Sequence, residues 1–293
     1  MNISEYESSQ ETKFHGHGDF PFNIYLCSIP LDFSIVPVHW HNDMEIIYIK
    51  KGQGNVTVNL APISVKEGDI VVVPPGQLHS IEQAENFSME YENIIFNLNM
   101  LMTPLGDSCT EKFFQPLVQG QILFPNYFPT DSCLHPALSL CLDTMDEICK
   151  TFPKGYQLAI KGQLFSFFYG LALASPAPLP LQKHKSLDHL KDILKYVETN
   201  YREKITITDA AGICGFSNSH FMKFFKSSMS VSFMDYLNDY RLTMAARLLL
   251  SSSDSIATIA TETGFENLSY FNRVFKRKYK CTPSFFRTQS SEP

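Results

Sequence analysis

Residues 211–216 read Ala-Gly-Ile-Cys-Gly-Phe, and residues 260–265 read Ala-Thr-Glu-Thr-Gly-Phe. The following stretches are also alike, with Ser-His-Phe-Met-Lys-Phe-Phe-Lys at 219–226 and Ser-Tyr-Phe-Asn-Arg-Val-Phe-Lys at 269–276. Each copy predicts a short helix, a glycine-bearing turn and a second helix, because apolar residues recur at helical spacing. The repeat therefore indicates a domain that contains the same helix-turn-helix unit twice.

The second helix of each copy has an apolar stripe and a polar outer face. The predicted buried stripes are Phe221, Phe224 and Phe225 in the first copy and Phe271, Val274 and Phe275 in the second. Cations on the outer face suit DNA phosphates, and Asn, Arg and Tyr side chains suit base edges. The alternative is a helical bundle whose charged faces are only solvated. The predicted DNA-binding residues are Asn218, Ser219, His220, Met222, Lys223, Lys226, Asn267, Ser269, Tyr270, Asn272, Arg273, Lys276 and Arg277.

Between the two copies, residues 231–250 keep helical apolar spacing and contain neither Pro nor Gly. A helix of roughly 20 residues is about 30 Å long. This length is close to the roughly 34 Å that separates successive major-groove openings on one face of B-DNA. The spacing therefore predicts a rod that holds two reading helices one duplex turn apart.

Residues 186–287 resemble the DNA-binding domain of the AraC/XylS family of bacterial transcription regulators. The residues that carry the resemblance are Arg241, Ala245, Leu248-Leu249, Ile259-Ala260, Gly264-Phe265, Ser269-Tyr270-Phe271, Arg273, Phe275-Lys276, Thr282-Pro283 and Arg287. Relatives usually carry Gly after each recognition helix, where this chain has Ser230 and Lys280, which adopt a left-handed cap less readily. Lys223 also stands where Arg is more usual, so we expect the first helix to contribute less base specificity.

Charge is unevenly distributed along the chain. Residues 1–185 contain 10 lysines and 19 acidic residues, residues 186–293 contain 14 basic and 11 acidic residues, and every arginine lies in the second part. A locally basic second part can bind nucleic acid, and an acidic first part does not do so by itself. The 7 cysteines include no Cys-x-x-Cys, which favours a reducing cytoplasm over a disulfide framework or zinc knuckle. No apolar run predicts a membrane span.

The part from residue 22 to residue 99 is predicted to be β-structure. Short strand-like runs at 45–49, 55–59, 70–73 and 89–96 are separated by turn-like stretches such as Gly52-Gln53-Gly54 and Pro74-Pro75-Gly76. Many short strands with even spacing predict a barrel or jelly roll.

Two motifs in this part resemble those of the cupin family, namely His39-x-His41-x3-Glu45-x6-Gly52 and Gly68-x5-Pro74-x-Gly76-x2-His79. The closing Asn of the second motif is absent, and Gln83 stands nearby. Strand alternation directs His39 and His41 into the barrel, where we expect them to meet Glu45 and His79. Three imidazoles and a carboxylate can hold a divalent transition metal.

Four interpretations of His39, His41, Glu45 and His79 remain open: an effector pocket, a metal-assisted sensor, a metal-dependent enzyme and a purely structural role. In cupin enzymes such residues hold a metal ion that performs the chemistry, whereas in AraC-type regulators the same pattern commonly marks an effector pocket. The DNA-binding part of this chain argues against catalysis. We therefore predict an effector pocket without a cofactor, with a metal-assisted sensor or a metal-dependent enzyme as alternatives.

Residues 101–174 contain apolar positions at helical spacing, which suit either packing on the chain's own barrel or a subunit contact. The Pro-rich stretch after residue 174 predicts a semi-extended linker. The predicted organisation is an arm at 1–19, an effector-binding barrel at 20–100, a helical connector and dimerisation region at 101–174, a linker at 175–185 and a DNA-binding domain at 186–293.

The sequence thus predicts an α+β chain, with a cupin-like β-barrel, a helical connector and an all-α domain of two helix-turn-helix units joined by a long helix. The predicted function is that of a cytoplasmic transcription regulator, not an enzyme. Its expected partners are double-stranded DNA, a small-molecule effector such as a sugar, a second copy of the chain and, since activation is the commoner behaviour in the family, RNA polymerase. No membrane partner is expected.

Overall fold

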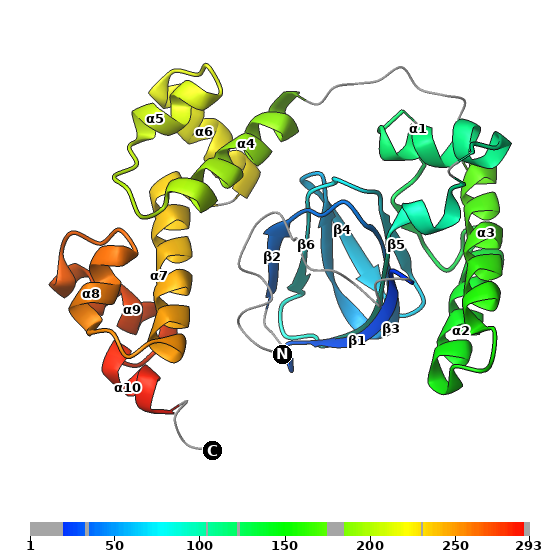
Figure 1. Cartoon of the computed structure of the whole chain (residues 1–293), viewed down its shortest axis with the longest axis horizontal. Coiled ribbons are helices and arrows are strands. Elements are labelled where there is room, and N and C mark those ends of the chain that lie inside the picture. The colour runs from blue at the N-terminus through cyan, green and yellow to red at the C-terminus, as the bar shows by residue number, and fades with distance from the viewer. Residues whose placement is uncertain are drawn as a thin grey trace. The chain divides into compact units, whose positions relative to one another are not determined.

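A computed structural model describes residues 20–32, 35–103, 105–121, 124–174, 185–229 and 231–289. Tertiary contacts divide the described residues into an N-terminal unit that ends at residue 174 and a C-terminal unit that begins at residue 185 (Figure 1). The predicted arm at 1–19 and linker at 175–185 lie outside the described residues, apart from Lys185, which begins the first helix of the C-terminal unit. The expected α+β fold class is confirmed.

The N-terminal unit is built on antiparallel strands. They are β1 (Phe22–Ile29), β2 (Ile35–His39), β3 (Met44–Val58), β4 (Ala61–Lys66), β5 (Ile70–Val73), β6 (His79–Gln83), β7 (Met89–Phe96) and β8 (Tyr127–Phe128). One sheet has the order β1-β7-β3-β5-β8, and the second half of β3 pairs with β4 and β6 while β6 also pairs with β2. Strand β3 therefore belongs to both walls of the barrel.

The prediction of a turn at Gly52-Gln53-Gly54 is wrong, because β3 continues through these residues. The ladder shifts register between Ile49 and Lys51 as β3 leaves β7 and β5 for β4 and β6. Gly52 adopts a φ of 77°, and a Cβ there would lie 2.0 Å from the carbonyl oxygen of Ser88. The glycine thus permits a bulged bend inside one strand, which carries it from one sheet to the other.

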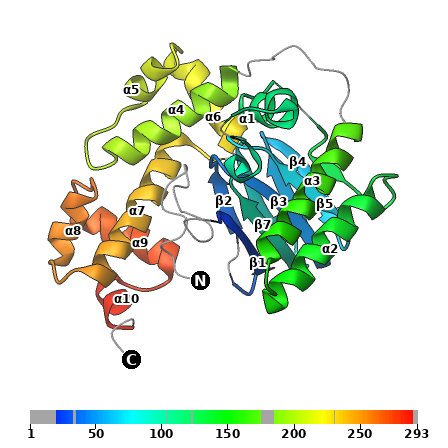
Figure 2. The ribbon, with the colours of Figure 1, turned by 45° about the vertical axis from the view of Figure 1, so that its right-hand side comes forward.

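Two long helices, α2 (His135–Thr151) and α3 (Tyr156–Ala174), cover the outer face of the sheet (Figure 2). They follow η2 (Leu98–Leu101), η3 (Thr110–Phe114) and α1 (Gln115–Val118). Ile46, Ile94 and Phe96 of the sheet form one core with Leu142 of α2 and Phe167 of α3. The apolar faces that suited either the chain's own barrel or a partner therefore pack on the barrel.

Leu158 of α3 does not share in this packing, because it is 79% exposed. Among the described residues, no helix is both long enough and apolar enough to cross a membrane.

The C-terminal unit consists of α4 (Lys185–Asn200), α5 (Ile207–Ile213), α6 (Asn218–Met229), α7 (Phe233–Ser251), α8 (Ile256–Glu262), α9 (Leu268–Tyr279) and α10 (Pro283–Gln289). Helix α7 joins the pair α5–α6 at one end to the pair α8–α9 at the other (Figure 1). The predicted helix at 231–250 begins two residues later because the Ser232 side chain caps it and accepts a hydrogen bond from the Asp235 amide.

Candidate DNA-binding surface and barrel cluster

The two second helices of the repeat bury their aromatic stripes. Phe221 and Phe225 of α6 are fully buried, as are Phe271 and Phe275 of α9, whereas Phe224 is only half-buried. The opposite faces consist of the residues that the sequence singles out for DNA. All of them are exposed: Asn218, Ser219, His220, Met222, Lys223 and Lys226 on α6, and Asn267, Ser269, Tyr270, Asn272, Arg273, Lys276 and Arg277 at α9. Their contact with DNA stays a prediction.

The outer face of α9 is held in place by contacts within the unit. The guanidinium of Arg273 lies over the ring of Tyr270, 5.3 Å from its centroid. The hydroxyl of Tyr270 in turn accepts a 3.2 Å hydrogen bond from Asn238 of α7. Asn267 is the N-cap of α9, and its Oδ1 accepts a 2.8 Å hydrogen bond from the Tyr270 amide. Asn267 therefore supports the helix in addition to any contact with DNA.

Not every cation of this segment faces outward. Lys278 turns toward α7, where its ammonium lies 2.8 Å from Asp239 Oδ2 and donates to the Thr243 hydroxyl. Burial lowers the pKa of Lys278 in spite of the pairing with Asp239. Lys280 follows α9 with a φ of 61°, so it does occupy the left-handed cap position where relatives usually carry glycine. Ser230, the equivalent residue after α6, lies outside the described residues.

Two arginines that carry the family resemblance are structural. Arg241 of α7 is 8% exposed and donates hydrogen bonds to the carbonyl oxygens of Tyr201 and Glu203. Arg287 of α10 donates in the same manner to the carbonyl oxygens of Leu249 and Asp254. Each arginine thus satisfies main-chain acceptors at a helix end and fixes one half of the unit.

A second candidate site lies inside the barrel. His39 ends β2 and pairs with His79, the first residue of β6, while Glu45 belongs to β3. His41 lies between β2 and β3. The four side chains are buried, and their candidate ligand atoms all lie within 4.8 Å of one another. The structure therefore brings together the residues that the two sequence motifs single out, and their role stays a prediction.

Main-chain carbonyl groups orient the imidazoles. The Nδ1–oxygen distances are 2.9 Å for His39 with Pro37, 3.0 Å for His41 with Asp43 and 2.9 Å for His79 with Gln77. A carbonyl oxygen can only accept, so each Nδ1 carries a hydrogen. In a neutral imidazole this leaves Nε2 as the acceptor. Carbonyl groups that bind the far nitrogen in this way are typical of metal-binding histidines.

The Glu45 carboxylate lies between two of these rings. Its Oε2 is 2.7 Å from His41 Nε2 and 3.0 Å from His79 Nε2. Burial by itself would raise the pKa of Glu45, but the charge of His79 and the hydrogen bond from His41 outweigh it and hold the pKa well below its usual range.

His79 Nε2 is buried and, although close to Glu45, makes no hydrogen bond of acceptable geometry within the described residues. The Nε2 atoms of neutral imidazoles and the Glu45 carboxylate oxygens are all acceptors. Acceptors that are buried together are unfavourable unless a positive charge lies between them. Either protons on the imidazoles or a bound cation can supply that charge.

The chain resembles transcription regulators that combine a ligand-binding domain with a helix-turn-helix domain. The family profile of the AraC-like ligand binding domain matches residues 31–151, and that of a helix-turn-helix domain matches residues 210–289. The chain belongs to the AraC family of transcription regulators.

Three relatives illustrate this membership. The chain is 23% identical to the HTH-type transcriptional regulator YdeC of Bacillus subtilis, over 97% of this chain and 98% of YdeC. It is 25% identical to the raffinose operon transcriptional regulatory protein RafR of Pediococcus pentosaceus, over 83% of each chain. The identity is 33% to the transposon Tn10 TetD protein of Escherichia coli, over 33% of this chain and 71% of TetD.

Proposed function

We propose that the protein regulates transcription in the cytoplasm by inserting α6 and α9 into successive major grooves of a DNA operator. The observation that carries this proposal is the pair of exposed polar faces at the two ends of α7. Helix α7 contains 19 residues, so it is about 28 Å long. This length suits two helices that read one face of the duplex about one turn apart.

The test is an electrophoretic mobility shift with DNA from the region upstream of the protein's own gene. We expect the wild-type protein to retard this DNA more strongly than a scrambled duplex. The double variant Lys223→Ala/Arg273→Ala should lose that preference, whereas Lys112→Ala, which removes an exposed cation from the N-terminal unit, should not. A wild-type protein that ignores duplex DNA at low ionic strength would refute the proposal.

The effector is proposed to be a neutral sugar or related metabolite that binds in the N-terminal unit. The support is the family membership and the similarity over most of both chains to a regulator named for a raffinose operon. Effector binding controls transcription only if its affinity differs between two conformations of the regulator. We propose activation, with RNA polymerase as the further partner.

We propose that the active form is a homodimer joined through α3. This helix presents Leu158, Phe165, Tyr169 and Leu173 to solvent, with exposures from 41% to 79%. Phe165, Tyr169 and Leu173 are spaced by four residues and share one face of the helix. Sedimentation velocity of Tyr169→Glu/Leu173→Asp should show a monomer where the wild type is a dimer. An unchanged sedimentation coefficient would exclude this surface.

A specific observation favours a second candidate function for the barrel cluster, a metal-assisted sensor. Three Nδ1–H groups are committed to carbonyl oxygens, and the four buried side chains offer their ligand atoms to one small volume. The side chains of His41, Glu45 and His79 are at most 3% exposed. A cluster this closed suits an ion better than an organic molecule. We therefore propose that these residues hold a divalent transition metal.

Metal analysis of the purified protein tests the second candidate. We expect one equivalent of a divalent metal in the wild type and none in His39→Ala/His79→Ala. His189→Ala, in the C-terminal unit, is the matched control and should retain the metal. Equal metal content in the wild type and the double variant would show that these residues do not hold a metal. Protons on the imidazoles would then supply the positive charge.

A further inference from the structure

A cavity of about 970 Å³ lies against the outer face of the sheet, where β1, β7 and β3 pass the end of α2 and the start of α3. Strand alternation separates it from the barrel cluster, because Tyr48 packs in the core beneath the helices and Glu45, three residues away, faces the interior. We call this cavity the outer groove. Its lining residues include Leu26, Lys50, Glu92, Asp146, Phe152 and Tyr156.

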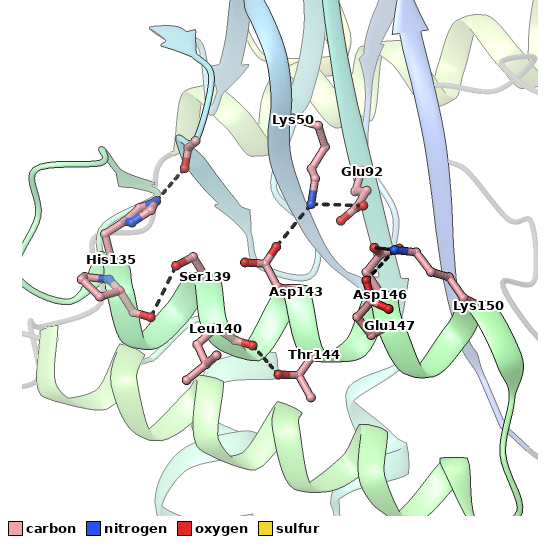
Figure 3. Close-up of polar contacts among 12 residues, drawn as sticks. Lys50, Glu92, His135, Ser139, Leu140, Asp143, Thr144, Asp146, Glu147 and Lys150 are labelled. Carbon is pink, nitrogen blue, oxygen red and sulfur yellow. Dashed lines mark hydrogen bonds and ion pairs between the residues drawn. The ribbon is translucent and has the colours of Figure 1, made fainter.

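The floor of the outer groove contains a buried carboxylate with unused hydrogen-bonding capacity. The Glu92 side chain is 7% exposed, and its Oε1 lies 3.3 Å from the ammonium of Lys50, which also lies 3.3 Å from Asp143 of α2 (Figure 3). Glu92 Oε2 is buried without a hydrogen-bond partner among the described residues. Burial raises the pKa of Glu92. A ligand that donates a hydrogen bond here would relieve the unsatisfied acceptor.

Aromatic side chains form one wall of the outer groove. Phe152 and Tyr156 meet edge to face with centroids 5.2 Å apart, and Tyr156 meets Phe20 in the same way at 5.7 Å. Phe152 is 59% exposed and ends α2 with a φ of 45°. A non-glycine residue in this left-handed region is strained. Phe152 caps the C-terminus of α2 in this conformation, and its exposed ring offers an apolar surface beside the cavity.

The charges around the outer groove balance. Lys50, Lys51 and Lys150 line it together with Glu90, Glu92 and Asp146, so neither an anion nor a cation is favoured as a whole. A hydroxyl group both donates and accepts hydrogen bonds. The hydroxyl groups of a ligand can therefore donate to the carboxylates of the groove and accept from its ammonium groups. The volume lies near the upper end of small-molecule sites, which span about 300–1,000 Å³.

We propose that the outer groove is a binding site, separate from the barrel interior, for a neutral polyhydroxylated molecule of the size of a di- or trisaccharide. This inference rests on the proposed function, because the effector class is shared. Glu92 accepts from a hydroxyl of the ligand, Lys50 donates to another, and the rings of Phe152 and Tyr156 pack against its apolar faces. The ligand contacts the sheet, α2 and α3. Its binding is therefore coupled to the position of α3, the helix that we propose as the dimer contact.

The test is isothermal titration calorimetry of the full-length protein with sucrose, melibiose and raffinose. We expect saturable binding of at least one of them. Two variants should weaken it at least tenfold: Glu92→Gln, which keeps the shape but removes the charge, and Leu26→Trp, which fills the outer groove from a position that is 70% exposed. Glu82→Gln, an exposed carboxylate on β6 outside the groove, is the matched control and should bind like the wild type.

Two results would overturn the inference. One is the absence of binding by all three sugars to the wild type. The other is equal affinity for the wild type, Glu92→Gln and Leu26→Trp, which would place the sugar elsewhere. Circular dichroism of each variant checks its fold, and Leu26→Trp alters only an exposed position. The mobility shift on the same preparations separates this inference from the proposed function: DNA binding without sugar binding refutes only the groove, and sugar binding without DNA binding refutes only the operator proposal.

Discussion

The two halves of the C-terminal unit have similar cores and different surfaces. Phe221 and Phe225 of α6 occupy the same places in the first half as Phe271 and Phe275 of α9 in the second, and all are fully buried. The outer face of α6 presents two cations, Lys223 and Lys226, whereas α9 presents Arg273, Lys276 and Arg277. Packing constrains the buried stripe in both halves, but nothing in the fold requires equal surfaces. We therefore expect unequal shares in DNA recognition.

The turns of the two halves also differ. Gly215 and Gly264 both have positive φ, 65° and 84°. A Cβ on Gly215 would meet nothing within 4 Å, whereas a Cβ on Gly264 would lie 2.5 Å from the Tyr201 carbonyl oxygen and 2.8 Å from Arg241 Nε. The first turn needs glycine only for its backbone conformation. The second needs it also for space, because the end of α4 and the buried arginine approach it closely.

The largest expected effect is on the free energy of unfolding, through substitutions at Gly215 and Gly264. Gly215→Ala should reduce the free energy of unfolding by about 1–2 kcal/mol, the cost of a left-handed residue. Gly264→Ala should cost about 1–3 kcal/mol more, because its methyl group also collides with main-chain and Arg241 atoms. Urea denaturation of both variants measures the difference. Equal losses would mean that the two turns tolerate a side chain alike and would remove this asymmetry.

The next effect concerns base reading. Arg273→Ala should cost about 1–3 kcal/mol of operator binding and relax preference at one base pair. Lys223→Ala should cost less and leave the sequence preference nearly unchanged, because a lysine offers a point charge rather than a fork of donors. Binding to a panel of operators with single base changes measures both. If Arg273→Ala keeps the wild-type ratio between operator and scrambled DNA, the assignment of base reading to α9 is wrong.

The smallest effect concerns phosphate contacts. Removing Lys276 or Lys226 should weaken binding to all DNA sequences alike and flatten the plot of log affinity against log salt by about 0.9 units for each lost contact. The pair Lys276→Ala/Arg277→Ala on α9 should therefore change the slope about twice as much as Lys226→Ala on α6. Affinity measured over a salt series gives the slopes. A loss limited to a single DNA sequence would show that the cation reads bases instead.

Local patterns in the chain were sufficient for the helix-turn-helix repeat and for the convergence of the barrel cluster. The stripe in α9 and the inward direction of His39 follow from periods of 3.6 and 2 residues, which depend on backbone geometry alone, whereas Glu45 and His79 were predicted from the resemblance to cupin motifs. The periodicity did not show that Lys278 turns inward, because Asp239 and Thr243, which bind it, lie on another helix. It also could not show the outer groove, whose Leu26, Lys50 and Glu92 belong to three strands.

The order of the residues predicted the family, the two kinds of domain and the residues of each candidate site, because short motifs within the chain resemble those of known families. Long-range packing settled the rest. The bend of β3 at Gly52 depends on the neighbouring carbonyl of Ser88. The inner faces of α2 and α3 pack on the chain's own barrel, and not on a partner, because the sheet presents an apolar surface to them. Contacts of this kind join residues far apart in the chain, so no local pattern contains them.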